Sequence, residues 1–310
     1  MNPLSGSYLF FLPARKIVLL SCVSADIILI SELRKLNQRK EKIQMTDWLN
    51  IEERVYIVTG GSSGIGDAIV KGLLDEGAYV VDADLNAPKR ESDHLTFFKT
   101  DVSNAENVQD TVQKTFDKFG KIDGVVNNAG INLPRLLVDS KHAGGKYELH
   151  ENEFDKMFSV NVKSAFLMAQ AVGHHLVDAG KGVIVNMSSE AGLEGSQGQS
   201  PYSATKGAIN GFTRSWAKEL GKNNIRVVGV APGIMEATGL RTPLYEEALA
   251  YTRGITVDQL RAGYKSTSTT PMGRSGHLYE VADLVAYLLS DRASYITGVT
   301  INVAGGKSRG

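Results

Sequence analysis

Cysteine, charge imbalance and long apolar runs are all scarce in this sequence. Its 310 residues contain one cysteine, Cys22, so no disulfide framework can form, and a reducing compartment such as the cytoplasm is expected. Basic and acidic residues both number 34, and this zero net charge argues against binding nucleic acid through bulk positive charge. The length allows one large α/β domain or two small ones.

The charge balance hides a basic leader at residues 1–44. These residues contain seven basic and three acidic side chains, a surplus of four positive charges. The stretch KIVLLSCVSADIILI is interrupted by Asp26 and is short for a membrane span, and no A-x-A-like cleavage site of a secretory signal follows it. We favour a start assigned too early, with Met45 as the native start, over a membrane-associated leader. No membrane partner is expected.

From residue 52 onward, β-branched runs alternate with segments of helical period. The runs RVYIVTG, AYVVDAD, LTFFKTD, IDGVVNNAG, GVIVNMSS, IRVVGVAPG and GVTINVAGG predict seven buried strands. Helices are expected over residues 65–77, 104–120, 153–178, 202–221 and 280–290. This alternation predicts a single α/β domain over residues 45–310, with one parallel sheet covered by helices on both faces.

Two connections are longer than this pattern needs. Residues 131–152 follow the fourth strand, and residues 234–276 follow the sixth. Long connections at the carboxyl ends of parallel strands are where such folds place their sites. We expect the second insertion, over about 234–275, to be a substrate lid.

The stretch TGGSSGIG, residues 59–66, lies between the first strand and its helix. Glycines there permit a tight turn and close approach to a pyrophosphate at the helix N-terminus. Glycine spacing alone does not distinguish this site from an ordinary turn, but the strand before it and the helix after it favour dinucleotide binding. The expected cofactor contacts are Gly60, Ser62, Ser63, Gly64, Ile65 and Gly66.

An acidic residue at the end of the second strand indicates which dinucleotide binds. Asp84 can accept hydrogen bonds from the adenosine ribose and would repel a 2′-phosphate, and the glycine loop has no Arg or Lys to attract one. NAD is therefore favoured over NADP. Asp82, two residues earlier on the same strand face, is the alternative, and either residue could be an ordinary acid at a strand end.

The stretch YSATK places Tyr202 and Lys206 one helical turn apart, a spacing at which most such pairs are not catalytic. Two further polar residues strengthen the case. Ser189 lies thirteen residues upstream, at the end of a predicted strand, and Asn161 lies on the helix before that strand. Ser188 is the alternative to Ser189.

Together these motifs resemble the short-chain dehydrogenase/reductase family, over about residues 52–306. The matching pieces are TGGSSGIG, NNAG at residues 127–130, Asn161, Ser189, YSATK and PG at residues 232–233. The resemblance implies a Rossmann-type, doubly wound parallel sheet in a homotetramer. It also implies hydride exchange between a nicotinamide cofactor and an alcohol or ketone.

The resemblance also gives each catalytic residue a role. A phenol has a pKa of about 10, so Tyr202 is a poor base unless a positive charge such as the Lys206 ammonium stabilises its phenolate. Tyr202 would exchange the proton of the substrate, and Ser189 would hold the substrate oxygen. Lys206 would also hold the nicotinamide ribose, and Asn161 would hold a water that links Lys206 to solvent.

Further cofactor contacts follow from the same resemblance: Asp101, Val102, Asn128, Ala129, Gly130, Tyr202, Lys206, Pro232 and Gly233. Two positions depart from the family pattern. Thr238 stands one place later than the usual threonine, and Ala304 stands where many relatives carry aspartate. No metal ligand is expected.

The two insertions are rich in basic side chains, which suit phosphate recognition. The first has Arg135, Lys141, His142 and Lys146, and the second has Arg241, Arg253, Arg261 and Lys265. Arg135 and Arg241 are the candidate substrate residues. The alternative for each basic residue is a solvated charge on a surface loop.

Within the family, the phrases PGIMEATGLRTPLYEEALAYTRGIT and INVAGGKSRG are most similar to bacterial enzymes that act on a phosphorylated polyol. That similarity implies NAD-dependent oxidation of D-sorbitol 6-phosphate to D-fructose 6-phosphate. One alternative is a reductase of a 3-oxoacyl thioester or of a free polyol or ketose. Another is a non-catalytic dinucleotide sensor, which would not need the Asn–Ser–Tyr–Lys set.

Overall fold

A seven-stranded parallel sheet forms the centre of the computed structural model, which describes residues 48–266 and 269–308. The strand order is β3-β2-β1-β4-β5-β6-β7. The strands are β1 (Val55–Thr59), β2 (Tyr79–Asp84), β3 (Leu95–Lys99), β4 (Gly124–Asn127), β5 (Gly182–Met187), β6 (Ile225–Pro232) and β7 (Thr300–Val303). The predicted fold class is confirmed, whereas the predicted leader, residues 1–44, lies outside the described residues.

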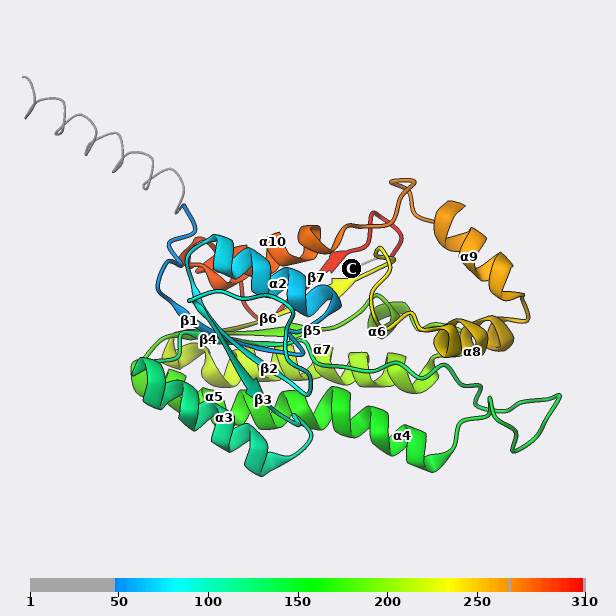
Figure 1. The fold of residues 1–310 in the computed structure, drawn as a ribbon, viewed down its shortest axis with the longest axis horizontal. Coiled ribbons are helices and arrows are strands. Elements are labelled where there is room, and N and C mark those ends of the chain that lie inside the picture. The colour runs from blue at the N-terminus through cyan, green and yellow to red at the C-terminus, as the bar shows by residue number, and fades with distance from the viewer. Residues whose placement is uncertain (1–47, 267–268, 309–310) are drawn as a thin grey trace, which may run out of the picture. The chain divides into compact units, whose positions relative to one another are not determined.

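Helices cover both faces of this sheet. The helices of the described residues are α2 (Gly64–Asp75), α3 (Ala105–Phe119), α4 (Glu151–Phe158), α5 (Ser164–Ala179), α6 (Ala191–Glu194), α7 (Ser200–Leu220), α8 (Pro243–Arg253), α9 (Val257–Ser266) and α10 (Leu278–Leu289). Helices α2 and α10 pack on one face, and α3, α5 and α7 pack on the other (Figure 1). Within the described ranges, no helix has the length and apolar content needed to cross a membrane.

The strands read as continuous apolar runs because both faces of the sheet are buried. In β1, Tyr56 and Val58 belong to the core under α2 and α10, while Ile57 belongs to the core under α3, α5 and α7. Successive side chains of a strand point to opposite faces, so a sheet covered on both sides needs apolar residues at every position.

The helix expected over residues 153–178 is not continuous. It consists of α4, a π turn η1 (Ser159–Lys163) and α5. Asn161 lies in the π turn, and its side chain bonds to both backbone groups of Ile131, accepting from the N–H and donating to the C=O, each at 2.8 Å. Single π turns inside helices occur frequently at functional sites, and this one directs Asn161 toward the end of β4.

The second insertion contains two helices that the sequence interpretation left as a connection. Thr242 caps the N-terminus of α8 and Pro243 is its first residue; Gly254, with a φ of 67° that suits glycine, caps its C-terminus. Leu249 and Leu260 form a small core of their own between α8 and α9. Figure 1 shows both helices beyond one end of the sheet.

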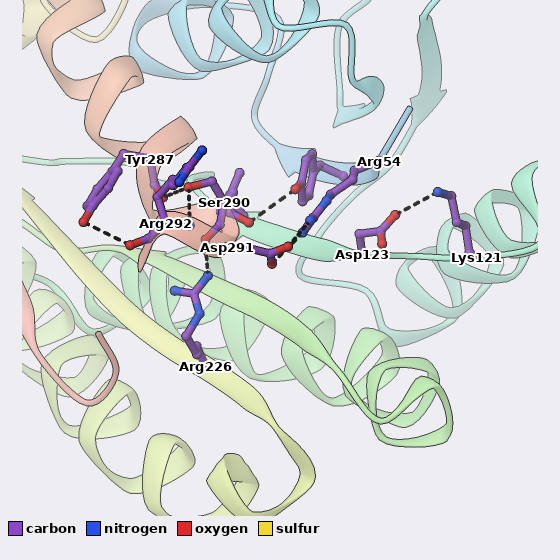
Figure 2. Close-up of polar contacts among 10 residues, drawn as sticks. Arg54, Lys121, Asp123, Arg226, Tyr287, Ser290, Asp291 and Arg292 are labelled. Atoms are coloured by element: carbon purple, nitrogen blue, oxygen red, sulfur yellow. Dashed lines mark hydrogen bonds and ion pairs between the residues drawn. The ribbon is translucent and has the colours of Figure 1, made fainter. Parts of the chain in front are cut away.

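A polar cluster lies at the amino-terminal edge of the sheet, opposite the strand ends that the insertions follow (Figure 2). Arg226 of β6 donates to the carbonyl oxygen of Ser290 at 3.0 Å and to that of Ile296 at 3.4 Å. Arg54 forms an ion pair with Asp291, which is in the short helix η3 (Asp291–Ala293). The cluster therefore fixes the turn between α10 and β7 to the sheet.

Replacing Arg226 with methionine is expected to lower the free energy of unfolding by about 1–3 kcal/mol. The Ile296 carbonyl oxygen loses the bond from Arg226, and the Ser290 carbonyl oxygen keeps only its longer bond from the Ala293 N–H, at 3.3 Å. Asp291→Asn should cost less than about 1 kcal/mol, because the Asp291 side chain is 66% exposed and exposed ion pairs contribute little. Urea unfolding at one protein concentration measures both changes. Equal losses in the two variants would contradict this ranking.

Candidate active site

A cavity of about 350 Å³ lies along the carboxyl ends of the strands. Its walls include Gly60 after β1, Asp84 at the end of β2, Asn128 after β4 and Pro232 at the end of β6. The chain leaves the adjacent strands β1 and β4 in opposite directions along the sheet, which makes this edge the topological switch point. Nucleotides bind at such a point in doubly wound folds.

The glycine loop forms the floor of this cavity. At Gly66 a Cβ atom would lie 1.9 Å from the carbonyl oxygen of Gly60 and 2.7 Å from Asn128 Nδ2, so only glycine fits. Asn128 Nδ2 donates to the carbonyl oxygens of Thr59 and Gly60, which fixes the loop against β4. The loop opens into the N-terminus of α2, so the residues present fit the pyrophosphate of a dinucleotide.

The two candidate acids on β2 have different surroundings. Asp82 is fully buried, and its carboxylate accepts from the Gly61 N–H at 2.9 Å and from the Ser62 hydroxyl at 2.7 Å. Burial raises the pKa of Asp82 to about 6. Asp84 instead lines the cavity and accepts from the Ser62 and Asn86 N–H groups, which leaves further lone pairs for a ligand. Asp82 thus supports the loop, while Asp84 faces the nucleotide space.

Most of the other predicted cofactor residues line the cavity too. They are Gly60, Ser63, Gly64, Ile65, Gly66, Val102, Asn128, Ala129, Gly130, Tyr202, Lys206 and Pro232. Ser62, Asp101 and Gly233 are not among its walls. The Ser62 hydroxyl bonds to Asp82 and to the carbonyl oxygen of Asn86, and the Asp101 carboxylate accepts from both the N–H and the hydroxyl of Ser103.

Residues that sequence reasoning missed also form these walls: Leu85, Asn86, Thr100, Ile131, Val160, Met187, Gly239 and Leu240. Several of them directly follow or precede a predicted strand end, and that position is the signal that could have identified them. Thr238 lines the cavity as well, and a Cβ at Gly64 would lie 3.2 Å from Thr238 Cβ. Although Thr238 stands one position later than the threonine usual in the family, it therefore still lies next to the glycine loop.

The residues of YSATK come together with Ser189 at the inner end of the cavity. Tyr202 and Lys206 lie in the first turns of α7, and the Lys206 ammonium lies 5.8 Å from the centre of the Tyr202 ring. Lys206 is buried and donates to the carbonyl oxygen of Met187 at 2.7 Å. The Ser189 side chain hydrogen-bonds with the Tyr202 phenol.

The two candidate serines also have different hydrogen-bond partners. Ser188 is buried, and its hydroxyl donates to the backbone carbonyl oxygen of Lys206 at 3.2 Å. The Ser189 hydroxyl accepts from the Ala191 N–H and hydrogen-bonds with Tyr202. Ser188 therefore positions α7, whereas Ser189 is next to the phenol.

The pKa of Tyr202 is shifted in the direction opposite to the sequence expectation. Burial raises the pKa of this phenol, and the hydrogen bond with Ser189 opposes the rise. Burial also lowers the pKa of Lys206 from 10.5 to about 8, because a buried ammonium is poorly solvated. Lys206 Nζ donates to the Met187 carbonyl oxygen, and in the protein alone burial outweighs the effects that favour the phenolate.

Asn161 lies beside this set without lining the cavity. Its Nδ2 donates to Thr205 Oγ1 at 3.1 Å, and Thr205 in turn donates to the carbonyl oxygen of Tyr202. A Cβ at Gly130 would lie 3.3 Å from Asn161 Oδ1 and 3.7 Å from Lys206 Nζ, so both side chains border this glycine. The contacts show Asn161 linking the end of β4 to α7, and its water stays a prediction.

A second cavity, of about 260 Å³, shares Tyr202 and Pro232 with the first. It lies between the strand ends and the second insertion, with α8 contributing Tyr245, Leu249 and Arg253. Its other walls include Asn132, Ser189, Glu190, Gln199, Gly233, Arg241, Tyr264 and Lys307. A substrate bound here would lie next to Ser189 and Tyr202.

The two arginines predicted to bind substrate have different surroundings. Arg241 lines the second cavity, and its guanidinium lies 3.7 Å from the centre of the Tyr264 ring. Arg135 lines neither of the two cavities and forms a half-buried ion pair with Glu153, with Nε–O distances of 2.9 and 3.0 Å. This placement argues against a substrate role for Arg135, because its charge is already compensated.

Known proteins match most of this chain. The family model described as short chain dehydrogenase matches residues 54–249. Sorbitol-6-phosphate 2-dehydrogenase of Klebsiella pneumoniae is 60% identical over 268 residues, which cover 86% of this chain and all of that protein. A 3-oxoacyl-[acyl-carrier-protein] reductase of Thermotoga maritima is 34% identical and aligns over 83% of this chain and 99% of its own.

Solved structures agree with the fold. Aldohexose dehydrogenase of Thermoplasma acidophilum superimposes with a TM-score of 0.72 at 28% identity, covering 83% of this chain and 95% of that one. A 3-ketoacyl-(acyl-carrier-protein) reductase of Brucella melitensis, solved in complex with NADH, gives 0.70 at 29% identity over 84% and 100% of the two chains. On the family match and these relatives, the chain belongs to the short-chain dehydrogenase/reductase family.

Proposed function

We propose that this protein oxidises D-sorbitol 6-phosphate to D-fructose 6-phosphate with NAD. The observation that carries the proposal is the juxtaposition of Ser189, Tyr202 and Lys206 where the nucleotide cavity meets the second cavity. The identity of 60% along the whole Klebsiella enzyme supports the choice of substrate. The Brucella reductase bound to NADH supports a nicotinamide dinucleotide as cofactor.

In this reaction Tyr202 acts as the base that takes the hydroxyl proton of the substrate. Ser189 donates a hydrogen bond to the same oxygen and holds it near the phenol. When bound, NAD supplies the acceptor for the hydride that leaves the carbinol carbon, together with a positive charge on the ring. The pKa of Tyr202 is raised in the protein alone. The positive charge of the oxidised nicotinamide must therefore add to that of Lys206 before the phenolate forms at neutral pH.

A substrate screen tests the proposal. NADH formation is followed with D-sorbitol 6-phosphate, D-sorbitol and D-mannitol, and NADH consumption is followed with a 3-oxoacyl thioester. We expect the highest kcat/KM with D-sorbitol 6-phosphate. A higher kcat/KM with the thioester would favour a 3-oxoacyl reductase, and no turnover of any substrate would favour a dinucleotide sensor.

We assign the preference for NAD over NADP to Asp84. Its carboxylate lines the cavity at β2, and the only basic residue among the described walls, Lys206, lies on α7 beyond β1 and β4. A 2′-phosphate at Asp84 would therefore be repelled by one negative charge without a positive charge to offset it.

The variant Asp84→Ala is expected to lose about 10- to 100-fold in kcat/KM for NAD, the effect of losing charge-assisted hydrogen bonds to the ribose. Its kcat/KM for NADP should stay the same or rise. Asp93→Asn is the matched control, because this exposed carboxylate precedes β3 and is not among the cavity walls. If Asp84→Ala left the preference for NAD over NADP unchanged, Asp84 would not be the residue that selects the cofactor.

Three further features belong to the same proposal. We propose that α8 and α9 form the substrate lid and that the enzyme acts in the cytoplasm as a homotetramer. The lid rests on the contribution of α8 to the second cavity, and on the Glu236 N–H to Gly276 C=O and Gly276 N–H to Ile234 C=O bonds that close the base of the insertion. Native mass measurement tests the tetramer and also shows whether residues 1–44 are present.

A further inference from the structure

The second cavity contains more positive charge than proton transfer at Tyr202 uses. Besides the catalytic residues, its described walls include the basic side chains of Arg241, Arg253 and Lys307. Two carboxylates, Glu190 and Glu236, line it as well. Which of these charges are already paired determines what the cavity can bind.

Lys307 and both carboxylates have partners within the protein. Lys307 forms an ion pair with Glu190. Glu236 accepts from the Leu278 N–H at 2.9 Å, and its other oxygen lies 3.2 Å from His277 Nδ1. In the part of the chain that the structure describes, no carboxylate forms an ion pair with Arg241 or Arg253, so these two guanidinium groups are the cavity's uncompensated charges.

Four other basic residues of the two insertions form ion pairs: Arg135 with Glu153, Lys146 with Glu247, Arg261 with Glu246 and Arg274 with Glu280. None of these four side chains lines the second cavity. Among the basic residues of the insertions, Arg241 and Arg253 are therefore the ones that line the second cavity without an ion pair in the described residues.

Arg253 is held in place relative to the catalytic phenol. It ends α8 and lies 3.4 Å from the Ser196 hydroxyl through Nη2. Helix α8 is also tied to the segment before α7 by the bonds from Gln197 Nε2 to the Thr252 carbonyl oxygen and from Gln199 Nε2 to the Tyr245 hydroxyl. Since α7 carries Tyr202, these contacts set the position of Arg253 with respect to Tyr202.

Arg241 reaches the same cavity from the segment before α8. Its guanidinium stacks on the Tyr264 ring at 3.7 Å, which orients the planar group while leaving its N–H donors available in the plane. A phosphate dianion needs about two positive charges and several N–H donors, and two guanidinium groups supply both.

On the basis of the proposed function, we propose that Arg241 and Arg253 together bind the phosphate group of the substrate, at the opposite end from the carbon that is oxidised beside Tyr202. Arg253 is then a specificity-determining residue that distinguishes a polyol phosphate from the free polyol. The ion pair between Lys307 and Glu190 remains intact in this arrangement and contributes no net charge.

The test compares kcat/KM for D-sorbitol 6-phosphate and D-sorbitol in the wild type and in Arg253→Met. We expect a loss of about 10- to 100-fold for the phosphorylated substrate, mainly through KM, and little change for D-sorbitol. Arg241→Met should behave in the same way. Arg253→Lys should recover part of the loss, because it restores the charge without the planar fork.

Two control variants separate charge at the site from structural effects. Lys146→Met removes a positive charge from an exposed ion pair outside the cavity and should leave both substrates unaffected. Ser196→Ala removes the contact to Arg253 while keeping its charge, and it should retain most of the discrimination between substrates.

Binding provides a readout that does not depend on turnover. Calorimetry with D-fructose 6-phosphate and D-fructose, on protein saturated with NADH, should show a weaker Kd in Arg253→Met for the phosphorylated ketose alone. Equal losses for both ligands would show a structural role and overturn the inference, as would an unchanged Kd for both. If the wild type oxidises D-sorbitol 6-phosphate and Arg253→Met has the same kcat/KM for it, the role of Arg253 is wrong but the proposed function stands. If the wild type oxidises no phosphorylated polyol, the proposed function fails with it.

Discussion

Replacing Tyr202 with phenylalanine is expected to lower kcat by about 10²- to 10⁴-fold, the usual contribution of a positioned proton acceptor. The change removes one oxygen atom from a half-buried side chain that lines both cavities and hydrogen-bonds with Ser189. Affinity for NADH, measured by fluorescence, should stay close to that of the wild type, because the glycine loop and Asp84 are untouched. Initial rates of NADH formation measure the loss.

Tyr245→Phe is the matched control for this loss. Tyr245 is another half-buried phenol that lines the second cavity, and its hydroxyl accepts from Gln199 Nε2 at 3.1 Å. Burial raises its pKa as well, but it has no lysine one helical turn away. We expect Tyr245→Phe to retain most of the activity. A Tyr202→Phe variant that turns over as fast as Tyr245→Phe would show that another group takes the proton.

Replacing Lys206 with methionine should abolish most of the activity and make the protein more stable. Burial lowers the pKa of Lys206 from 10.5 to about 8, so the folded state disfavours the charged form that the unfolded chain prefers. At about 1.4 kcal/mol per pKa unit, the penalty near pH 7 is on the order of 3 kcal/mol, offset by about 1 kcal/mol for the bond to the Met187 carbonyl that methionine loses.

The pH dependence of this stability gain has a definite sign. Below about pH 8 the folded protein holds a protonated, buried ammonium and the full penalty applies; above it the ammonium loses its proton and the penalty declines toward pH 10.5. In urea unfolding without cofactor, Lys206→Met should therefore have a larger free energy of unfolding than the wild type at about pH 7. The difference should be smaller at about pH 9.5. A variant less stable than the wild type at both pH values would contradict the assigned burial penalty.

Activity should reveal the second role of Lys206. The rate of oxidation should rise with pH in the wild type, because the Tyr202 phenol must lose its proton to act as a base. Without the ammonium, the remaining activity of Lys206→Met should rise only at higher pH, because the phenolate has lost one stabilising charge. A pH profile identical to that of the wild type would remove Lys206 from this role.

Strand positions were predictable because their cause is local. Both faces of the sheet are covered, so each strand is a continuous apolar run, and the glycine loop follows β1 directly. The interruption at Asn161 was not predictable from periodicity, because it depends on contacts with Ile131 and Thr205, 30 and 44 residues away. Helix α8 could have been predicted from the capping threonine and the proline at Thr242–Pro243.

The roles of several polar residues at the site also depend on contacts that the sequence does not reveal. The sequence alone could not choose between Asp82 and Asp84 for the cofactor, or between Ser188 and Ser189 for the substrate oxygen. In each case two residues of the same type lie close together at one strand end. Burial and bonding separate them, since Asp82 is used by the glycine loop and Ser188 by the backbone of α7. Arg135 matched the phosphate expectation by residue type, but its ion pair with Glu153 depends on a helix that only the fold brings near.

We infer that Tyr202 takes the proton of the C2 hydroxyl of a polyol phosphate while the hydride at C2 passes to the cofactor. The most direct measurement uses D-sorbitol 6-phosphate carrying deuterium at C2, with NAD as oxidant, and follows the label by mass spectrometry. We predict that deuterium appears in the reduced cofactor and that unlabelled D-fructose 6-phosphate is formed. Deuterium retained in the sugar product, or no reduced cofactor from this substrate, would contradict the claim.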